Sequence, residues 1–187
     1  AELGGNNALL LMADSEFETL VPQVARLAFS FGGQRCTALR RFVVEKSVSE
    51  LFEALIRSAV EQLRIIGPED EDCDVGPLIS NEHLERVDRA VRGATKRGAR
   101  IVAGGKPAAG ATGHYYHPTI LADLPPGDPL VQEELFGPVA VLQIAEDFEH
   151  GLRLVNGVRQ GLLASIVTGS KERREEFYRR AEAGIVL

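Results

Sequence analysis

Apolar residues recur along the chain with two alternating periods, one typical of helices and the other of strands. Between Asp14 and Phe31 they return every three or four residues, which predicts an amphipathic helix. We expect Asp14 to cap this helix, and the glycines at 32–33 to end it, because glycine readily adopts the left-handed conformation found after helices. Residues 47–50 have the form of a capping box and open a second helix, before the turn at 67–68.

The rest of the chain alternates in the same way. We expect Ser80 to cap a third helix that ends near Gly98, and further helices over residues 148–155 and 171–183. The expected strands or extended segments cover residues 39–44, 100–103, 116–121, 139–144, 162–168 and 185–187. Strands that alternate with amphipathic helices are typical of layered α/β folds. We therefore predict a three-layer α/β domain with a mostly parallel sheet.

Length and charge narrow the class of protein. The 187 residues suffice for one sizeable core and are too few for two ordinary domains. No apolar run approaches the roughly 20 residues that a membrane helix needs. The formal net charge of −6 disfavours binding to nucleic acid or to an anionic membrane, which would need a basic surface. We expect neither as a partner.

The cysteine and histidine content indicates compartment and metal use. Two cysteines, Cys36 and Cys73, are too few for a disulfide framework, so a reducing, cytoplasmic location is the simpler interpretation. The four histidines show no zinc-site spacing with either cysteine. We therefore expect no metal site.

Cys36 is the first candidate for chemistry. It lies in a loop between a predicted helix and a predicted strand, beside glycines that would let a ligand approach the backbone closely. The neighbouring Arg35 and Arg40 could favour its thiolate. From this position alone, however, a small buried apolar residue is a better interpretation of Cys36 than a nucleophile.

Two acidic segments are further candidates. Glu2 stands beside Gly4 and Gly5 and could accept a proton from a thiol or a water, although a surface glutamate in a turn explains it as well. Glu134 lies in residues 133–138, where two acids, an aromatic residue and a Gly-Pro turn follow one another. It could bind ribose hydroxyls, or the segment could be a charged loop before a strand.

Taken together and in this order, these segments resemble the motifs of the aldehyde dehydrogenase superfamily. Residues 2–5 resemble its glutamate signature and residues 33–36 its cysteine signature, and the distance along the chain between them is that of the family. Residues 134–138 resemble the later motif that contacts the cofactor. Segments of the family are also similar to residues 76–80, 117–120, 156 with 161–162, and 183–186 of this sequence. The resemblance runs essentially from end to end.

The resemblance implies an aldehyde dehydrogenase catalytic-domain fold and the oxidation of an aldehyde to a carboxylic acid with NAD or NADP. Cys36 would attack the aldehyde and carry a thiohemiacetal and then a thioester, and its backbone N–H would stabilise the oxyanion. Glu2 would activate the hydrolytic water as general base. Glu134 would bind the nicotinamide-side ribose, Phe136 would pack near the nicotinamide, and Leu3 would also contact the cofactor.

The resemblance also implies that parts of the enzyme lie elsewhere. We expect residues 1–187 to be the thiol-bearing catalytic domain, truncated at both ends, with an N-terminal domain outside the chain that makes most contacts with the cofactor. The full enzyme would be a homo-oligomer, and the isolated chain inactive. Residues 2–8, 34–37 and 40–41 lean towards semialdehyde-oxidising branches, such as the α-aminoadipic and succinylglutamate semialdehyde enzymes.

Three other interpretations differ in chemistry. In a CoA-acylating member, CoA would take the acyl group, and a water-activating Glu2 would be unnecessary. A thiol hydrolase without NAD would need a histidine base near Cys36, and the four histidines are all distant in sequence. An inactive structural module would need neither.

Overall fold

The computed structural model describes residues 4–67, 70–108 and 113–187. Its centre is one seven-stranded sheet in the order β3-β4-β5-β2-β1-β6-β7. The strands are β1 (Ala8–Leu11), β2 (Arg41–Glu45), β3 (Arg100–Ala103), β4 (Thr119–Ala122), β5 (Val139–Ala145), β6 (Leu163–Val167) and β7 (Ile185–Val186). Neighbouring strands are parallel except β3 and β4, which pair antiparallel. The predicted mostly parallel sheet is confirmed.

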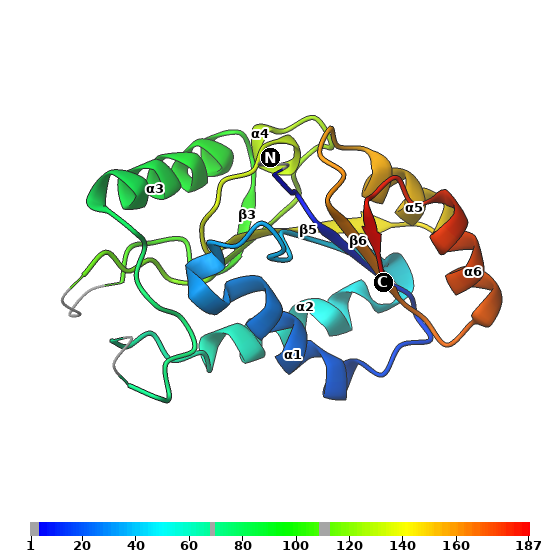
Figure 1. Ribbon diagram of the computed structural model, residues 1–187, viewed down its shortest axis with the longest axis horizontal. Coiled ribbons are helices and arrows are strands. Elements are labelled where there is room, and N and C mark those ends of the chain that lie inside the picture. The colour runs from blue at the N-terminus through cyan, green and yellow to red at the C-terminus, as the bar shows by residue number, and fades with distance from the viewer. Residues whose placement is uncertain (1–3, 68–69, 109–112) are drawn as a thin grey trace.

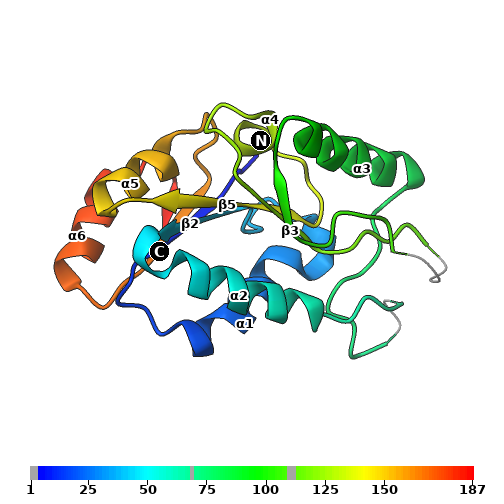
Figure 2. The ribbon, with the colours of Figure 1, turned by 180° about the vertical axis from the view of Figure 1, so that it is seen from behind.

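Helices cover both faces of this sheet (Figures 1 and 2). One face carries α1 (Phe17–Phe29) and α2 (Ser49–Glu61). The other carries α3 (Asn81–Lys96), α4 (Pro129–Gln132), α5 (Phe148–Asn156) and α6 (Lys171–Arg180). Short 3-10 turns at Ser30–Gly33 and Lys46–Val48 follow α1 and precede α2. The domain therefore has the three α/β layers that the sequence predicts.

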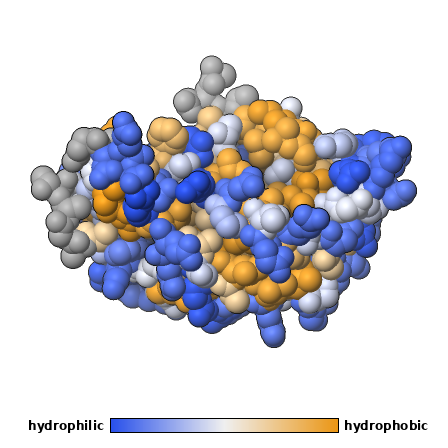
Figure 3. Space-filling view, turned by 90° about the horizontal axis from the view of Figure 1, so that it is seen from below, coloured by the Kyte–Doolittle hydropathy of each residue, from blue (hydrophilic) through white to orange (hydrophobic). Residues whose placement is uncertain are grey.

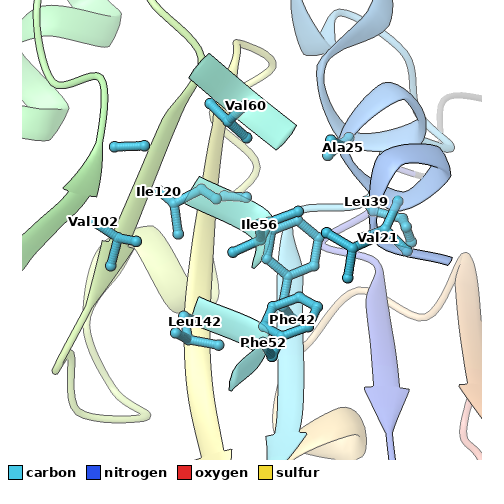
Figure 4. Close-up of a cluster of buried hydrophobic side chains, with 14 of the residues drawn as sticks. Val21, Ala25, Leu39, Phe42, Phe52, Ile56, Val60, Val102, Ile120 and Leu142 are labelled. Carbon is cyan, nitrogen blue, oxygen red and sulfur yellow. The ribbon is translucent and has the colours of Figure 1, made fainter. Parts of the chain in front are cut away.

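Alternation along the central strands divides the core between the two faces. Phe42 and Val44 of β2 face α1 and α2, and the Phe42 ring meets the Phe52 ring of α2 edge-on at 5.7 Å (Figure 4). The intervening Val43 packs with Leu152 of α5 and Phe177 of α6 on the opposite face. Successive side chains of a strand point to opposite faces, so β2 serves both cores.

The first strand, β1, is the main element that periodicity did not predict. Residues 8–12 are uniformly apolar and at most 5% exposed, because β1 is central in the sheet and helices cover both of its faces. A strand buried on both sides shows no alternation, which removes the period-two signal. The four-residue helix α4 was also not predicted.

Two predicted helix caps are wrong and one is confirmed. Helix α1 begins at Phe17, and Asp14 accepts hydrogen bonds from Thr168 and Ser170 across the sheet edge. Residues 47–50 form no capping box, because 46–48 form a 3-10 turn and α2 begins at Ser49. Ser80 caps α3 as expected by accepting a hydrogen bond from the His83 N–H.

Seen from below α1 and α2, the surface shows apolar patches that hydrophilic side chains separate (Figure 3). Across the described ranges, no helix combines the length and the apolar character needed to cross a membrane.

Candidate active site

The segments that carry the sequence motifs meet at the amino ends of the parallel strands. Ala8 of β1 pairs in register with Arg41 of β2 and Ala164 of β6, and Arg41 pairs with Val141 of β5. Because these strands start at one level, the loops before them share one edge of the sheet. Residues 4–7, 33–40, 134–138 and 161–162 are therefore neighbours although they span the whole sequence.

The loop that bears Cys36 is held in an unusual backbone conformation. Phe31, Gly32 and Gly33 have positive φ values of 57°, 63° and 65°, so the chain turns sharply after α1. A Cβ atom on Gly33 would lie 2.2 Å from the Gly137 carbonyl oxygen. Only glycine permits this approach of two backbones. The turn leads the chain to Cys36, which is an exposed residue.

Asn7 fixes the Cys36 loop to the sheet. Its side-chain amide donates hydrogen bonds to the carbonyls of Cys36 at 2.7 Å and Ala38 at 2.9 Å. Its amide oxygen accepts from the Leu163 N–H at 3.1 Å, and the residue is 2% exposed. One buried amide therefore joins the segments before β1, β2 and β6. Sequence reasoning assigned Asn7 no role, because its three partners are distant in sequence.

Arg40 connects the same loop to the Glu134 segment. Its guanidinium donates to the carbonyls of Gly33 and Arg35, both at 3.0 Å, and lies 3.4 Å from the Glu134 carboxylate. Burial lowers the pKa of Arg40, and the charges of Glu134 and Cys36 act in the opposite direction. Opposite charges nearby favour the charged form, so the guanidinium stays charged beside the thiol.

Glu134 and Phe136 face the Cys36 loop from the segment before β5. The Glu134 side chain is 19% exposed, and its second oxygen lies 3.0 Å from the position that a Cβ on Gly4 would occupy. Phe136 has a φ of 60° and stacks over the Arg40 guanidinium at 5.5 Å. His83 hydrogen-bonds the Phe136 carbonyl oxygen at 2.7 Å. The carboxylate therefore keeps acceptor capacity for ribose hydroxyls, beside a partly exposed aromatic ring.

The structure brings Cys36, Glu134 and Phe136 to one edge, whereas Glu2 and Leu3 lie outside the described residues. The expectation for Arg35 changes. Its guanidinium donates to the Leu27 carbonyl and the Ser30 hydroxyl and lies over the Phe31 ring. Arg40, by contrast, donates to the Arg35 carbonyl, in the peptide bond that leads to Cys36.

Two other kinds of site have no support in the described ranges. Among these residues, no histidine hydrogen-bonds Cys36, and His83 and His150 bond the backbone at Phe136 and Glu146. Nor do the described residues contain a group of three His, Cys, Asp or Glu side chains that could hold a metal ion.

Comparison with known proteins accounts for this arrangement. The model of the aldehyde dehydrogenase family matches residues 1–187. The chain belongs to the aldehyde dehydrogenase family. The family is NAD(P)-dependent.

Several relatives act on semialdehydes, as their names state. Over its whole length the chain is 34% identical to succinate semialdehyde dehydrogenase of Escherichia coli and covers 40% of that protein. It is 36% identical to α-aminoadipic semialdehyde dehydrogenase of mouse over 89% of the chain, which is 31% of that protein. The chain therefore spans about 40% or less of these relatives' length.

Solved structures show the same fold. HpcC from Thermus thermophilus superposes with a TM-score of 0.94 at 36% identity, over 99% of this chain and 37% of that one. Betaine aldehyde dehydrogenase of Staphylococcus aureus, solved with NAD+, gives 0.94 at 28% identity, over 99% of this chain and 37% of that chain. The expected aldehyde dehydrogenase catalytic-domain fold is confirmed.

Proposed function

We propose that the protein containing this chain oxidises an aldehyde to a carboxylic acid with NAD or NADP, and that Cys36 is its nucleophile. The observation that carries the proposal is the meeting of the Cys36 loop with Glu134 and Phe136 at one sheet edge, within a family match over the whole chain. Cys36 is an exposed residue, so a small carbonyl compound can approach it.

In this mechanism the Cys36 thiolate attacks the carbonyl carbon and forms a tetrahedral thiohemiacetal whose oxygen carries the developing charge. The Cys36 N–H would donate a hydrogen bond to that oxygen. Loss of hydride from the same carbon leaves a thioester on Cys36. NAD(P), when bound, accepts this hydride. Water then cleaves the thioester, which releases the acid and restores the thiol.

The residues near Cys36 fit a nicotinamide cofactor. Glu134 would hold the ribose hydroxyls through the carboxylate oxygen that Arg40 does not contact, and Phe136 would pack beside the nicotinamide ring. Leu3 would extend this contact. We propose that other cofactor contacts lie outside residues 1–187, because the relatives are more than twice as long as the chain. A homo-oligomeric, cytoplasmic enzyme remains a prediction.

The substrate class follows from the relatives. Succinate, 2-hydroxymuconic and α-aminoadipic semialdehyde dehydrogenases are all between 34% and 36% identical to this chain, which favours an aldehyde that also carries a carboxylate. A panel of semialdehydes and neutral aldehydes on the full-length protein tests this class.

Replacement of Cys36 tests the nucleophile. In the full-length protein, Cys36→Ser should lower NAD(P)H production by at least about 1,000-fold, because an alcohol is a far weaker nucleophile than a thiolate near neutral pH. Cys73→Ser is the matched control and should leave the rate unchanged, since the Cys73 thiol donates to the Ile66 carbonyl in the turn-rich segment after α2. Equal loss in both variants, or turnover in Cys36→Ser, would overturn the assignment.

Replacement of Glu2 tests the general base. Glu2→Gln should slow hydrolysis of the thioester more than its formation, so the acyl-enzyme should accumulate during turnover. Intact-protein mass spectrometry after a rapid quench measures this species, with wild-type protein as the reference. An unchanged steady-state rate with no acyl-enzyme would show that another group activates the water.

A further inference from the structure

The guanidinium of Arg40 contacts three of the segments that meet at the site, namely residues 4–7, the Cys36 loop and residues 134–138. It donates to Gly33 and Arg35 in the Cys36 loop, to Gly5 before β1 at 3.3 Å, and to Gly137 before β5 at 3.4 Å. It also pairs with Glu134 and lies under the Phe136 ring. Only 3% of the residue is exposed. A buried charge with this many partners costs solvation free energy, which a purely apolar side chain would avoid.

Backbone contacts place Arg40 where these segments converge. The Asn7 carbonyl accepts from the N–H of Arg40 at 3.1 Å and from that of Arg41 at 3.0 Å, and the Arg40 carbonyl accepts from Val141. Because neighbouring residues of an extended chain point to opposite faces, the two arginine side chains diverge. Arg40 reaches the Cys36 loop, and Arg41 donates to the carbonyls of Leu154 and Val155 at the end of α5.

We propose that Arg40 is a positioning residue, which joins the Cys36 loop to the Glu134–Phe136 segment and places a positive charge at the Arg35 carbonyl, in the peptide bond that leads to Cys36. A planar guanidinium with five N–H donors suits this task, because it can bond several carbonyls and a carboxylate at once. Through Glu134 and Phe136, the same group sets the distance between the nucleophile and the cofactor subsite. This second role rests on the proposed function, whereas the effect on the thiol does not.

The thiol effect is measured without turnover, as the rate at which iodoacetamide alkylates Cys36 at pH 7, followed by mass spectrometry of the Cys36 peptide in the full-length protein. Arg40→Met should slow alkylation about tenfold, because it removes the cation at the Arg35 carbonyl next to Cys36, and a neighbouring cation favours the thiolate that reacts. Arg40→Lys keeps the charge and should stay within about twofold of wild type.

Arg41 offers a matched control, because it is as buried as Arg40 and differs in contacting no acidic side chain or cysteine among the described residues. Arg41→Met should lower thermal stability and leave Cys36 alkylation within about twofold of wild type. Equal slowing by Arg40→Met and Arg41→Met would show that both act only through the fold, and would overturn the proposal. Slow alkylation in Arg40→Lys would do so as well, since the charge is retained.

The positioning role has a separate kinetic readout. Lysine cannot reproduce the forked contacts with Gly33, Arg35 and Glu134, so Arg40→Lys should raise KM for NAD(P) about fivefold while kcat changes less than about twofold. An unchanged KM would overturn this half of the proposal. If no aldehyde supports NAD(P) reduction by wild-type protein while the alkylation rates follow expectation, the proposed function fails and the charge effect of Arg40 stands.

Discussion

The two edges of the parallel sheet handle polar groups in opposite ways. At the amino edge, Asn6, Asn7, Arg40 and Arg41 are each at most 3% exposed and bond mainly to backbone carbonyls. At the carboxyl edge, Lys46 and Glu146 form an ion pair in which both side chains are at least 60% exposed. The amino edge therefore contains a cluster of costly buried polar groups, whereas this ion pair at the carboxyl edge is solvated.

This difference indicates the edge at which residues serve a purpose besides folding, namely the candidate site. Open α/β sheets generally bind ligands beyond the carboxyl ends of their strands, where the order of the strands reverses. In this domain the carboxyl edge carries the exposed Lys46–Glu146 pair and the part-buried contact between Asp14 and Thr168. Cys36, Glu134 and the two buried arginines lie at the opposite, amino edge. Buried polar networks locate the candidate site better than the general rule for the fold class does.

Adding a methyl group to a glycine at each edge should give the largest contrast in stability. Gly33→Ala should destabilise the protein by about 3 kcal/mol, because alanine is strained at a φ of 65° and its Cβ would lie 2.2 Å from the Gly137 oxygen. Gly169→Ala at the carboxyl edge meets its nearest atom at 3.5 Å and should change stability by less than about 1 kcal/mol. Urea unfolding of both variants measures the difference. Equal effects would remove the contrast between the edges.

Neutralising Asp14 should give an intermediate effect that depends on pH. Burial raises the pKa of Asp14, but hydrogen bonds from Thr168 and Gly169 and the charge of Arg173 outweigh it, so the net pKa is lowered. Because the pKa is lower in the folded state, the ionised Asp14 stabilises the protein at pH values above its unfolded pKa of about 3.9. This stabilisation is lost as the pH falls through the folded pKa. Asp14→Asn should cost about 1 kcal/mol at pH 7, since solvent screens this half-exposed carboxylate.

The pH series distinguishes charge from packing at this position. Urea unfolding at pH 7, 5 and 3 should show the gap between wild type and Asp14→Asn constant down to pH 5 and narrower at pH 3. A gap that stays constant to pH 3 would mean that the Asp14 charge contributes nothing and that the amide disturbs the local packing.

Breaking the exposed ion pair should give the smallest effect. Lys46→Met removes the 2.9 Å contact with Glu146, and the free energy of unfolding should fall by less than about 0.5 kcal/mol, because exposed pairs gain little in water. The same measurement in 1 M salt should abolish even this difference. A loss above about 1 kcal/mol would show that the carboxyl edge depends on its charges as the amino edge does.

The sequence by itself determined the fold class and most elements. Helical periodicity located α2, α3, α5 and α6, and the resemblance of residues 33–36 and 134–138 to family motifs identified the segments of the site. Local signals sufficed in these cases because neighbouring residues encode a helix with one buried face, and they also make up a short motif. The cap at Asp14 was wrong because its partners, Thr168 and Ser170, are more than 150 residues away.

Tertiary structure alone decided which residues share the site and which arginine serves it. Asn7 joins Cys36 to Leu163, and Arg40 rather than Arg35 joins the Cys36 loop to Glu134. Strand β1 likewise became recognisable only as an interior strand of the sheet, because burial on both faces removes its alternation. The physical reason is common to these cases: parallel strands bring the loops before them to one edge whatever their separation in sequence, and no local pattern records that proximity.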